Sequence, residues 1–150
     1  MIAQIPDIIF LNGEAMSLYS NPLEDYWTIT NRKRPPLIPS PDCVRGYVAT
    51  WEISDDRLLL RDIKGTIRKR NFLLQRVKAP YTLKKLFSGR TPVMATWYSG
   101  RLRVPAGQMI RFEDNGYDSR FEKEVIVTVE DGRVTRMVTL DNINRTVVSA

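Results

Sequence analysis

The lysine and arginine side chains of this chain crowd into its middle. Residues 57–111 hold fourteen Lys or Arg and one acidic residue, Asp62, so this segment carries a charge of +13. The rest of the chain holds nine basic and sixteen acidic residues, a charge of −7. A dense block of one sign repels itself unless its side chains spread over a surface or meet an anion. The pattern therefore predicts an acidic partner or ligand.

Within this block, two expected hairpins each place a pair of arginines on one sheet face. Arg57 and Arg61 share a face of one strand, and Arg101 and Arg103 share a face of another. If the two hairpins are adjacent, the four guanidinium groups converge on one concave surface beside aromatic rings. The candidate partner-binding residues are Arg57, Arg61, Tyr98, Arg101, Arg103 and Arg111.

The sequence leaves three interpretations of this surface open. It could grip an acidic protein, with fast and salt-sensitive association. It could bind nucleic-acid phosphates and stack bases on an exposed ring. It could also be a solvated face whose arginines pair with Asp and Glu from the flanks. Arginine outnumbers lysine sixteen to seven, and arginine is the better residue for bidentate contacts with carboxylate or phosphate.

A second group of chemically capable residues is the acidic stretch 113–124. Its carboxylates surround Gly116 and Tyr117, and such oxygen ligands could hold Ca²⁺ or Mg²⁺, although the order of an EF-hand is not met. Asp118 and Glu122 could also act as an acid and base pair near Tyr117. The plainer interpretation is a solvated loop or a surface that pairs with the arginines. The acidic residues are Glu113, Asp114, Asp118, Glu122 and Glu124.

The chain contains no histidine and one cysteine, Cys43. This composition excludes Ser-His-Asp and Cys-His nucleophiles, histidine acid–base catalysis and nearly all zinc chemistry. The sequence also has no Gly-rich phosphate loop or dinucleotide-binding fingerprint, and we expect no cofactor and no metal. Non-catalytic binding is therefore the leading hypothesis, and an enzyme that uses carboxylates remains an alternative.

The elements that must position these residues follow the pattern of successive β-hairpins. Asn12-Gly13 and Asp131-Gly132 are turn pairs that favour tight hairpins between short apolar runs. Many short strands of this kind favour an antiparallel sheet that closes or folds into two layers. We therefore expect one mainly β domain over residues 1–150, in which hairpins form a partly closed barrel or a two-layer sheet with one or two short helices.

Local patterns give finer expectations. Helical turns are expected in 22–30, where Pro22 can occupy the first helical position, and in 80–87, where Thr82 can cap. Lys64-Gly65 is expected to break a strand before 66–70, and further strands are expected over 72–77 and 93–98. Cys43 is expected to be an incidental buried thiol, and Trp27, Trp51 and Trp97 are expected to lie in the core.

Three runs, residues 45–53, 95–107 and 115–122, resemble a family of small uncharacterised bacterial proteins, and the likeness covers most of the chain. The resemblance implies a one-domain bacterial cytoplasmic protein. Small proteins of this kind often act as immunity proteins, so a toxin is the specific hypothesis for the acidic partner. The lack of a signal peptide pattern and of a stretch of roughly 20 apolar residues also favours the cytoplasm and no membrane association.

Overall fold

A computed structural model describes residues 3–149 of the chain, apart from 90, 112–116, 118–119 and 143–145. Within this part, ten strands and two short helices follow one another. The strands are β1 (Asp7–Leu11), β2 (Glu14–Leu18), β3 (Tyr47–Ser54), β4 (Arg57–Arg70), β5 (Arg76–Tyr81), β6 (Val93–Met94), β7 (Gly100–Arg111), β8 (Arg120–Glu130), β9 (Arg133–Asp141) and β10 (Thr146–Ser149). The helices are α1 (Pro22–Ile29) and α2 (Leu83–Leu86).

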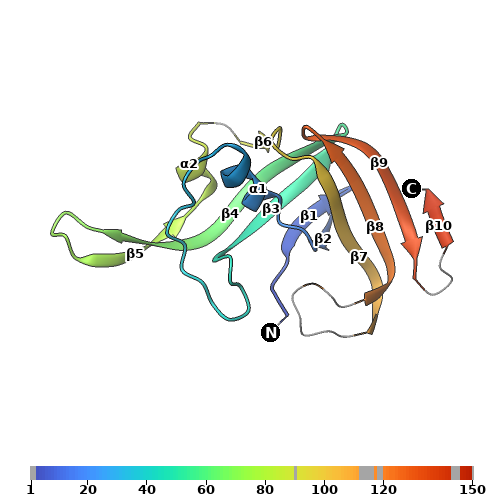
Figure 1. The fold of residues 1–150 in the computed structure, drawn as a ribbon, viewed down its shortest axis with the longest axis horizontal. Coiled ribbons are helices and arrows are strands. Elements are labelled where there is room, and N and C mark those ends of the chain that lie inside the picture. Colours follow the sequence, from blue (N-terminus) through green and yellow to red (C-terminus); the bar gives the residue numbers. More distant parts are fainter. Residues whose placement is uncertain (1–2, 90, 112–116, 118–119, 143–145, 150) are drawn as a thin grey trace.

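The strands form one mixed sheet in the order β2-β1-β3-β4-β9-β8-β7, to which β5, β6 and β10 add at the sides (Figure 1). All pairs are antiparallel except β1 with β3, which run parallel. The two ends of the order approach each other where the amide of Tyr19 donates to the carbonyl of Arg103 at 2.7 Å, but the sheet is not closed into a barrel. The expected mainly β fold with one or two short helices is confirmed.

Turn chemistry explains the two hairpins that the sequence predicts most clearly. Asn12 and Gly13 join β1 to β2 with φ of +52° and +79°, and Asp131 and Gly132 join β8 to β9 with φ of +50° and +82°. Both central residues of such turns need positive φ, which Asn, Asp and Gly adopt at low cost. The turn residues alone therefore determine where these two hairpins form.

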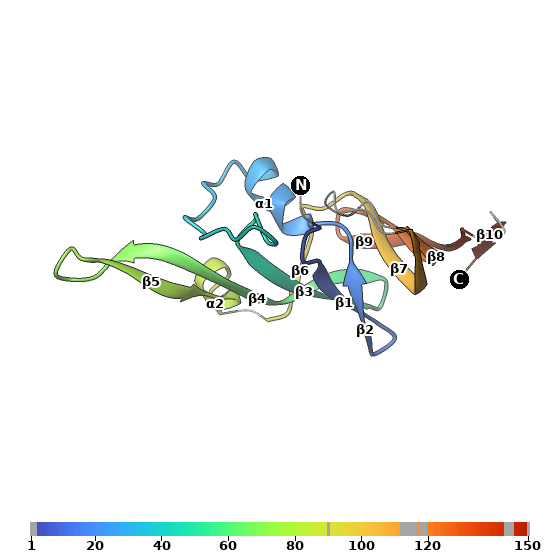
Figure 2. The same ribbon diagram turned by 90° about the horizontal axis from the view of Figure 1, so that it is seen from below.

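The core lies between one face of the sheet and helix α1, which Figure 2 shows on one side of the strands. Trp51 is fully buried, Trp27 of α1 is 5% exposed, and Trp97 packs against the same cluster. The three tryptophans thus support the fold, as expected. Cys43 is also buried, and its thiol donates to the carbonyl of Tyr47 at 3.3 Å.

The expected break at Lys64-Gly65 is wrong, because β4 runs without interruption through both residues. Gly65 serves instead for close approach. A Cβ placed on it would lie 2.9 Å from the carbonyl oxygen of Gly46 and 3.0 Å from the Cβ of Tyr47. The missing side chain therefore lets β4 pass tightly beneath the loop that enters β3.

We predict that Gly65→Ala lowers the free energy of unfolding by about 1–3 kcal/mol, the usual cost of overpacking a tight site. Urea denaturation would measure the loss. Gly89→Ala gives a comparison of another kind, because a Cβ there meets nothing within 4 Å but the φ of +88° costs an alanine about 1–2 kcal/mol. The loss at position 65 should therefore be steric, and the loss at position 89 should come from the backbone. Equal stability of Gly65→Ala and the natural chain would contradict the close approach.

Two further expected strands differ from the structure. Residues 71–75 form a turn, and the strand after it starts at Arg76 rather than at Phe72. The expected strand over 93–98 is only the two residues of β6, after which turns lead to β7. In the first case, the side chain of Asn71, just before the apolar run, accepts backbone hydrogen bonds that form a turn.

Candidate macromolecule-binding site

Strands β4 and β5 form a ribbon that extends beyond the rest of the sheet (Figures 1 and 2). β4 is 14 residues long, and its pairing with β3 ends at Gly65. The loop residues Pro36 and Ile38 bond to its backbone at Arg68 and Thr66. Beyond that point β4 pairs only with β5 among the described strands. A two-stranded ribbon of this kind has few neighbouring elements to stabilise it. Packing within the fold therefore does not explain which residues stand on its exposed faces.

One face of this ribbon carries cations in cross-strand pairs. Arg68 lies opposite Lys78, and Arg70 lies opposite Arg76. Alternation along β4 places Lys64 on the same side. We call this surface the basic face. Its members are Lys64, Arg68, Arg70, Arg76 and Lys78, and all are exposed.

The basic face is not neutralised within the described part of the chain. The ion pairs found there lie at other arginines, and residues 64–78 contain no Asp or Glu. Like charges directly opposite each other destabilise a strand pair. The ribbon therefore holds an unfavourable arrangement that an external anion would relieve.

Three large apolar side chains lie at the end of this ribbon. Phe72 is 91% exposed, Leu73 62% and Leu74 70%. We call them the apolar tip. The side chain of Asn71 builds the turn, because its Oδ1 accepts hydrogen bonds from the amides of Leu73 at 2.9 Å and Gln75 at 3.0 Å. The turn thus fixes an apolar group beyond the cations of the basic face.

The backbone of the tip is strained at Leu74, whose φ is +61°. A leucine in the left-handed region is an outlier, and the conformation costs an L-residue with a Cβ about 1–2 kcal/mol. Asn or Gly would suit the position better. Leu74 therefore combines backbone strain with a large exposed apolar side chain, and neither feature stabilises the fold.

We predict that Leu74→Asn stabilises the ribbon by about 0.5–1 kcal/mol, because Asn tolerates positive φ. Hydrogen exchange of the amides in 68–78 would show the change as stronger protection. The matched control is Leu73→Asn, which makes the same chemical change at a residue outside the left-handed region. The account of strain would be contradicted if both variants changed protection equally.

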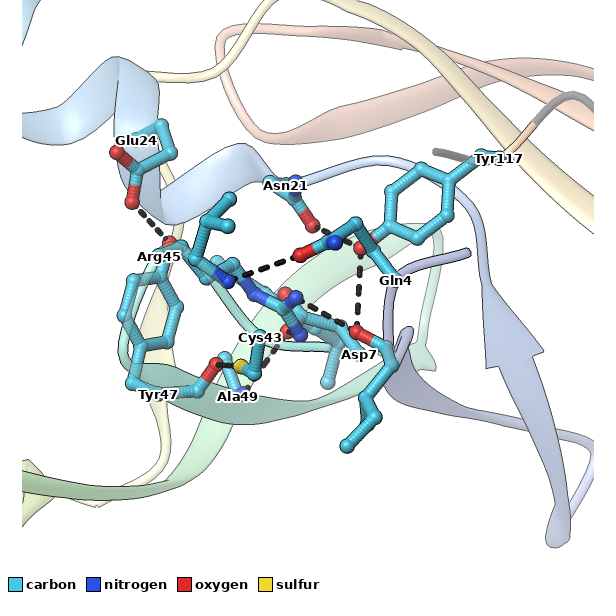
Figure 3. Close-up of polar contacts among 12 residues, drawn as sticks. Gln4, Asp7, Asn21, Glu24, Cys43, Arg45, Tyr47, Ala49 and Tyr117 are labelled. Atoms are coloured by element: carbon cyan, nitrogen blue, oxygen red, sulfur yellow. Dashed lines mark hydrogen bonds and ion pairs between the residues drawn. The ribbon is translucent and has the colours of Figure 1, made fainter. Parts of the chain in front are cut away.

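A buried polar network lies at the other side of the fold, between the N-terminal segment and β3 (Figure 3). Asp7 is fully buried and pairs with Arg45 at 2.8 Å. Its Oδ1 also accepts from the amide of Ala49 at 3.0 Å, and its Oδ2 accepts from the indole of Trp51 at 3.1 Å. Burial raises the pKa of the Asp7 carboxyl, and Arg45 and the other donors oppose that rise. Because both oxygens are occupied and inaccessible, Asp7 is a structural residue rather than a general base.

The same network continues to helix α1. Glu24 pairs with Arg34 at 3.0 Å and accepts a hydrogen bond from the hydroxyl of Tyr47 at 2.5 Å. The Arg34 guanidinium also lies over the ring of Trp27, 5.4 Å from its centroid. Together with Arg45, these contacts hold both ends of the segment 34–45 against the sheet. Residues 36–38 of that segment bond to β4 at the base of the ribbon, so the network supports the candidate site.

The structure places the predicted arginines on strands that are not neighbours. Arg57 and Arg61 lie on β4, whereas Arg101 and Arg103 lie on β7, and β9 and β8 come between them in the sheet. The adjacency that would make the four groups converge is therefore absent. Arg57 pairs with Asp55 at 3.6 Å and Arg61 pairs with Glu52 at 2.7 Å.

The remaining candidates have different environments. Arg103 pairs with Glu124 and lies over the ring of Tyr19, whereas Arg101 is exposed. Tyr98 is buried and its hydroxyl donates to the carbonyl of Arg101 at 3.1 Å. Burial raises the pKa of Tyr98 to about 12. Arg111 ends β7, and its side chain lies outside the described residues.

The acidic stretch 113–124 is described only in part. Glu113, Asp114 and Asp118 lie outside the described residues. Glu124 pairs with Arg103, so one residue of this stretch pairs with an arginine. The hydroxyl of Tyr117 donates to Asn21 at 3.0 Å. Among the described residues, no group of three or more acidic or cysteine side chains could hold a metal ion.

Comparison with known proteins adds no assignment to this geometry. No family model matches the chain, and no curated protein or solved structure matches it significantly. None of the described helices has the length and apolar character needed to cross a membrane.

Proposed function

We propose that this protein is a non-catalytic binding protein, in which the β4–β5 ribbon engages an acidic macromolecular partner. The observation that carries the proposal is that two like-charged pairs lie opposite each other across the strands, Arg68 with Lys78 and Arg70 with Arg76. Carboxylates of a partner would relieve this repulsion and accept bidentate bonds from the arginines. The proposed binding element is thus the basic face of the ribbon rather than the surface of Arg57, Arg61, Arg101 and Arg103.

An acidic protein is the leading partner, because the tip adds an apolar anchor to the charges. Protein interfaces draw most of their affinity from a few apolar or arginine side chains buried in the partner's pockets. A protruding ribbon (Figure 1) with Phe72 at its end suits a cleft with acidic walls. A bacterial toxin in the cytoplasm is one partner of this kind, and the chain would then act as its immunity protein.

Capture with three baits tests the proposal. The baits are the natural chain, the variant Arg70→Glu/Arg76→Glu, and the control variant Arg133→Glu/Arg136→Glu. The control makes the same charge change on exposed residues of β9. We expect a specific acidic protein to bind the natural chain and the control and to be lost from the ribbon variant. A set of captured proteins that is the same for all three baits would refute the proposal.

Nucleic acid is the second candidate, favoured by the position of Phe72 beside cations on a narrow ribbon. Some proteins insert an apolar wedge between base steps while basic side chains contact the phosphates. A titration with a labelled oligonucleotide at two salt concentrations tests this candidate. Several phosphate contacts would give a steep linear fall of log K with log salt. No binding at low salt would remove it, because a chain of net charge +6 should attract the oligonucleotide there.

A further inference from the structure

A pocket opens on the inner face of the sheet, at the end where β1 turns into β2 and β3 turns into β4. Its volume is about 440 Å³, within the range of about 300–1,000 Å³ that is usual for ligand pockets. The side chains that form its apolar wall pack against the core while remaining partly exposed. They are Leu11, Met16, Ile53, Val125 and Met137.

The mouth of this pocket is acidic. Glu14, Asp55 and Asp56 line it together with Asn12. Asp55 is 84% exposed and pairs loosely with Arg57 at 3.6 Å, whereas Glu14 and Asp56 form no ion pair with any described residue. A ligand for this pocket would combine an apolar group with positive charge. We call this site the end pocket.

The β4–β5 ribbon has that combination. Phe72 and Leu73 stand at its tip, and Arg70 and Arg76 lie directly behind them. The apolar tip would occupy the pocket and pack against its apolar wall, while the two guanidinium groups reach the carboxylates at the mouth. Burying apolar surface in a preformed pocket and pairing arginine with carboxylate are both favourable.

Tip and end pocket lie at opposite ends of the same strand. β4 starts beside Asp56 at the pocket and ends at Arg70 before the tip. Its 14 residues span roughly 45 Å at about 3.3 Å per residue. The tip therefore cannot reach the pocket of its own chain, and the contact must join two molecules.

We propose that the apolar tip of one molecule docks into the end pocket of a second copy, with Phe72 inside the pocket and Arg70 and Arg76 against the acidic mouth. The inference rests on the proposed role of the ribbon as the binding element. Because the two surfaces differ, the contact is heterologous, and copies add head to tail into chains or rings. Self-association occupies the ribbon, so an external acidic partner would compete with it.

Complementation between two variants tests this arrangement. The tip variant, Phe72→Ser/Leu73→Ser, loses the apolar tip and keeps the pocket. The pocket variant, Glu14→Lys/Asp56→Asn, loses the acidic mouth and keeps the tip, and Asn suits the φ of +57° at position 56. Sedimentation equilibrium of each protein, and of an equimolar mixture, would report their masses. Ile29→Ser, at another exposed apolar residue, is the control.

We expect the natural chain and the Ile29→Ser control to grow in mass with concentration, and to do so less at high salt. Each variant alone should associate at least about tenfold more weakly. Their mixture should form a pair and nothing larger, because only one intact tip and one intact pocket remain. A natural chain that stays monomeric, a mixture that does not pair, or a pocket variant that assembles normally would overturn the inference.

The outcomes that contradict self-association differ from those that contradict the proposed function. The pocket variant keeps the basic face and the apolar tip, so it should still capture the acidic partner. If the natural chain is monomeric but captures this partner, the self-association is contradicted and the proposed function is not. The proposed function is decided by a different measurement, which is whether the ribbon variant Arg70→Glu/Arg76→Glu still captures the acidic partner.

Discussion

Reversing the charges of Arg70 and Arg76 to Glu should weaken the affinity for the acidic partner at least about 100-fold, or roughly 2.7 kcal/mol. Each reversal removes an attraction and places a like charge against a carboxylate of the partner. The fold itself should not suffer, because two glutamates across the strands repel each other as the two arginines do. Surface plasmon resonance at two salt concentrations would measure the affinity and the rate of association.

The single variant Arg70→Glu sharpens this prediction. It places opposite charges across the ribbon, which should stabilise the strand pair by about 0.2–1 kcal/mol. Affinity for the partner should nevertheless fall. If Arg70→Glu raises the stability of the ribbon and lowers the affinity for the partner, Arg70 has a role in binding and not in stability. If Arg133→Glu/Arg136→Glu weakened binding as much as the ribbon variant, the effect would come from net charge and not from the basic face.

Asp7→Asn should lower the free energy of unfolding by about 3–5 kcal/mol, the usual cost of removing one partner from a buried ion pair. The substitution leaves the Arg45 guanidinium without its counter-ion at a site that is 7% exposed. It also places an amide group where three N–H donors meet a carboxylate. Urea denaturation followed by tryptophan fluorescence would measure the loss.

Glu52→Gln is the matched control for Asp7→Asn. Glu52 pairs with Arg61 at 2.7 Å, but the Arg61 side chain is 48% exposed. A pair that is partly open to solvent contributes little, so this variant should change the free energy of unfolding by less than about 1 kcal/mol. Comparable losses for both variants would contradict the structural importance assigned to the buried pair.

Local chemistry explains why parts of the fold could be predicted from sequence. Asn12-Gly13 and Asp131-Gly132 need few neighbours to form tight turns, so their hairpins appear where expected. The parallel pairing of β1 with β3 could not be predicted, because it depends on Asp7 meeting Arg45 across 38 residues. In the sequence, Asp7 resembles any acidic residue at the start of a strand. The role of Gly65 could not be predicted for the same reason. The sequence suggests a strand break there, whereas the glycine is needed because Gly46 lies against it in the folded chain.

The position of the binding site could be predicted only in part. The basic block from Arg57 to Arg111 points to β4, but the pairing of Arg61 with Glu52 and of Arg103 with Glu124 depends on which strands lie side by side. Phe72 to Leu74 had the composition of a strand, and the side chain of Asn71 turned them into a tip. A usable signal was present. Arg70-Asn71 and Gln75-Arg76 flank the apolar triplet symmetrically, as in a hairpin turn.

The most direct test of the binding role of the ribbon is a hydrogen-exchange footprint of the captured acidic partner on this chain. We expect binding to protect the backbone amides of residues 68–78, and Arg70→Glu/Arg76→Glu to abolish this protection. β8 and β9 should serve as an internal reference with unchanged exchange. Protection of β8 and β9 with an unchanged ribbon would contradict the account.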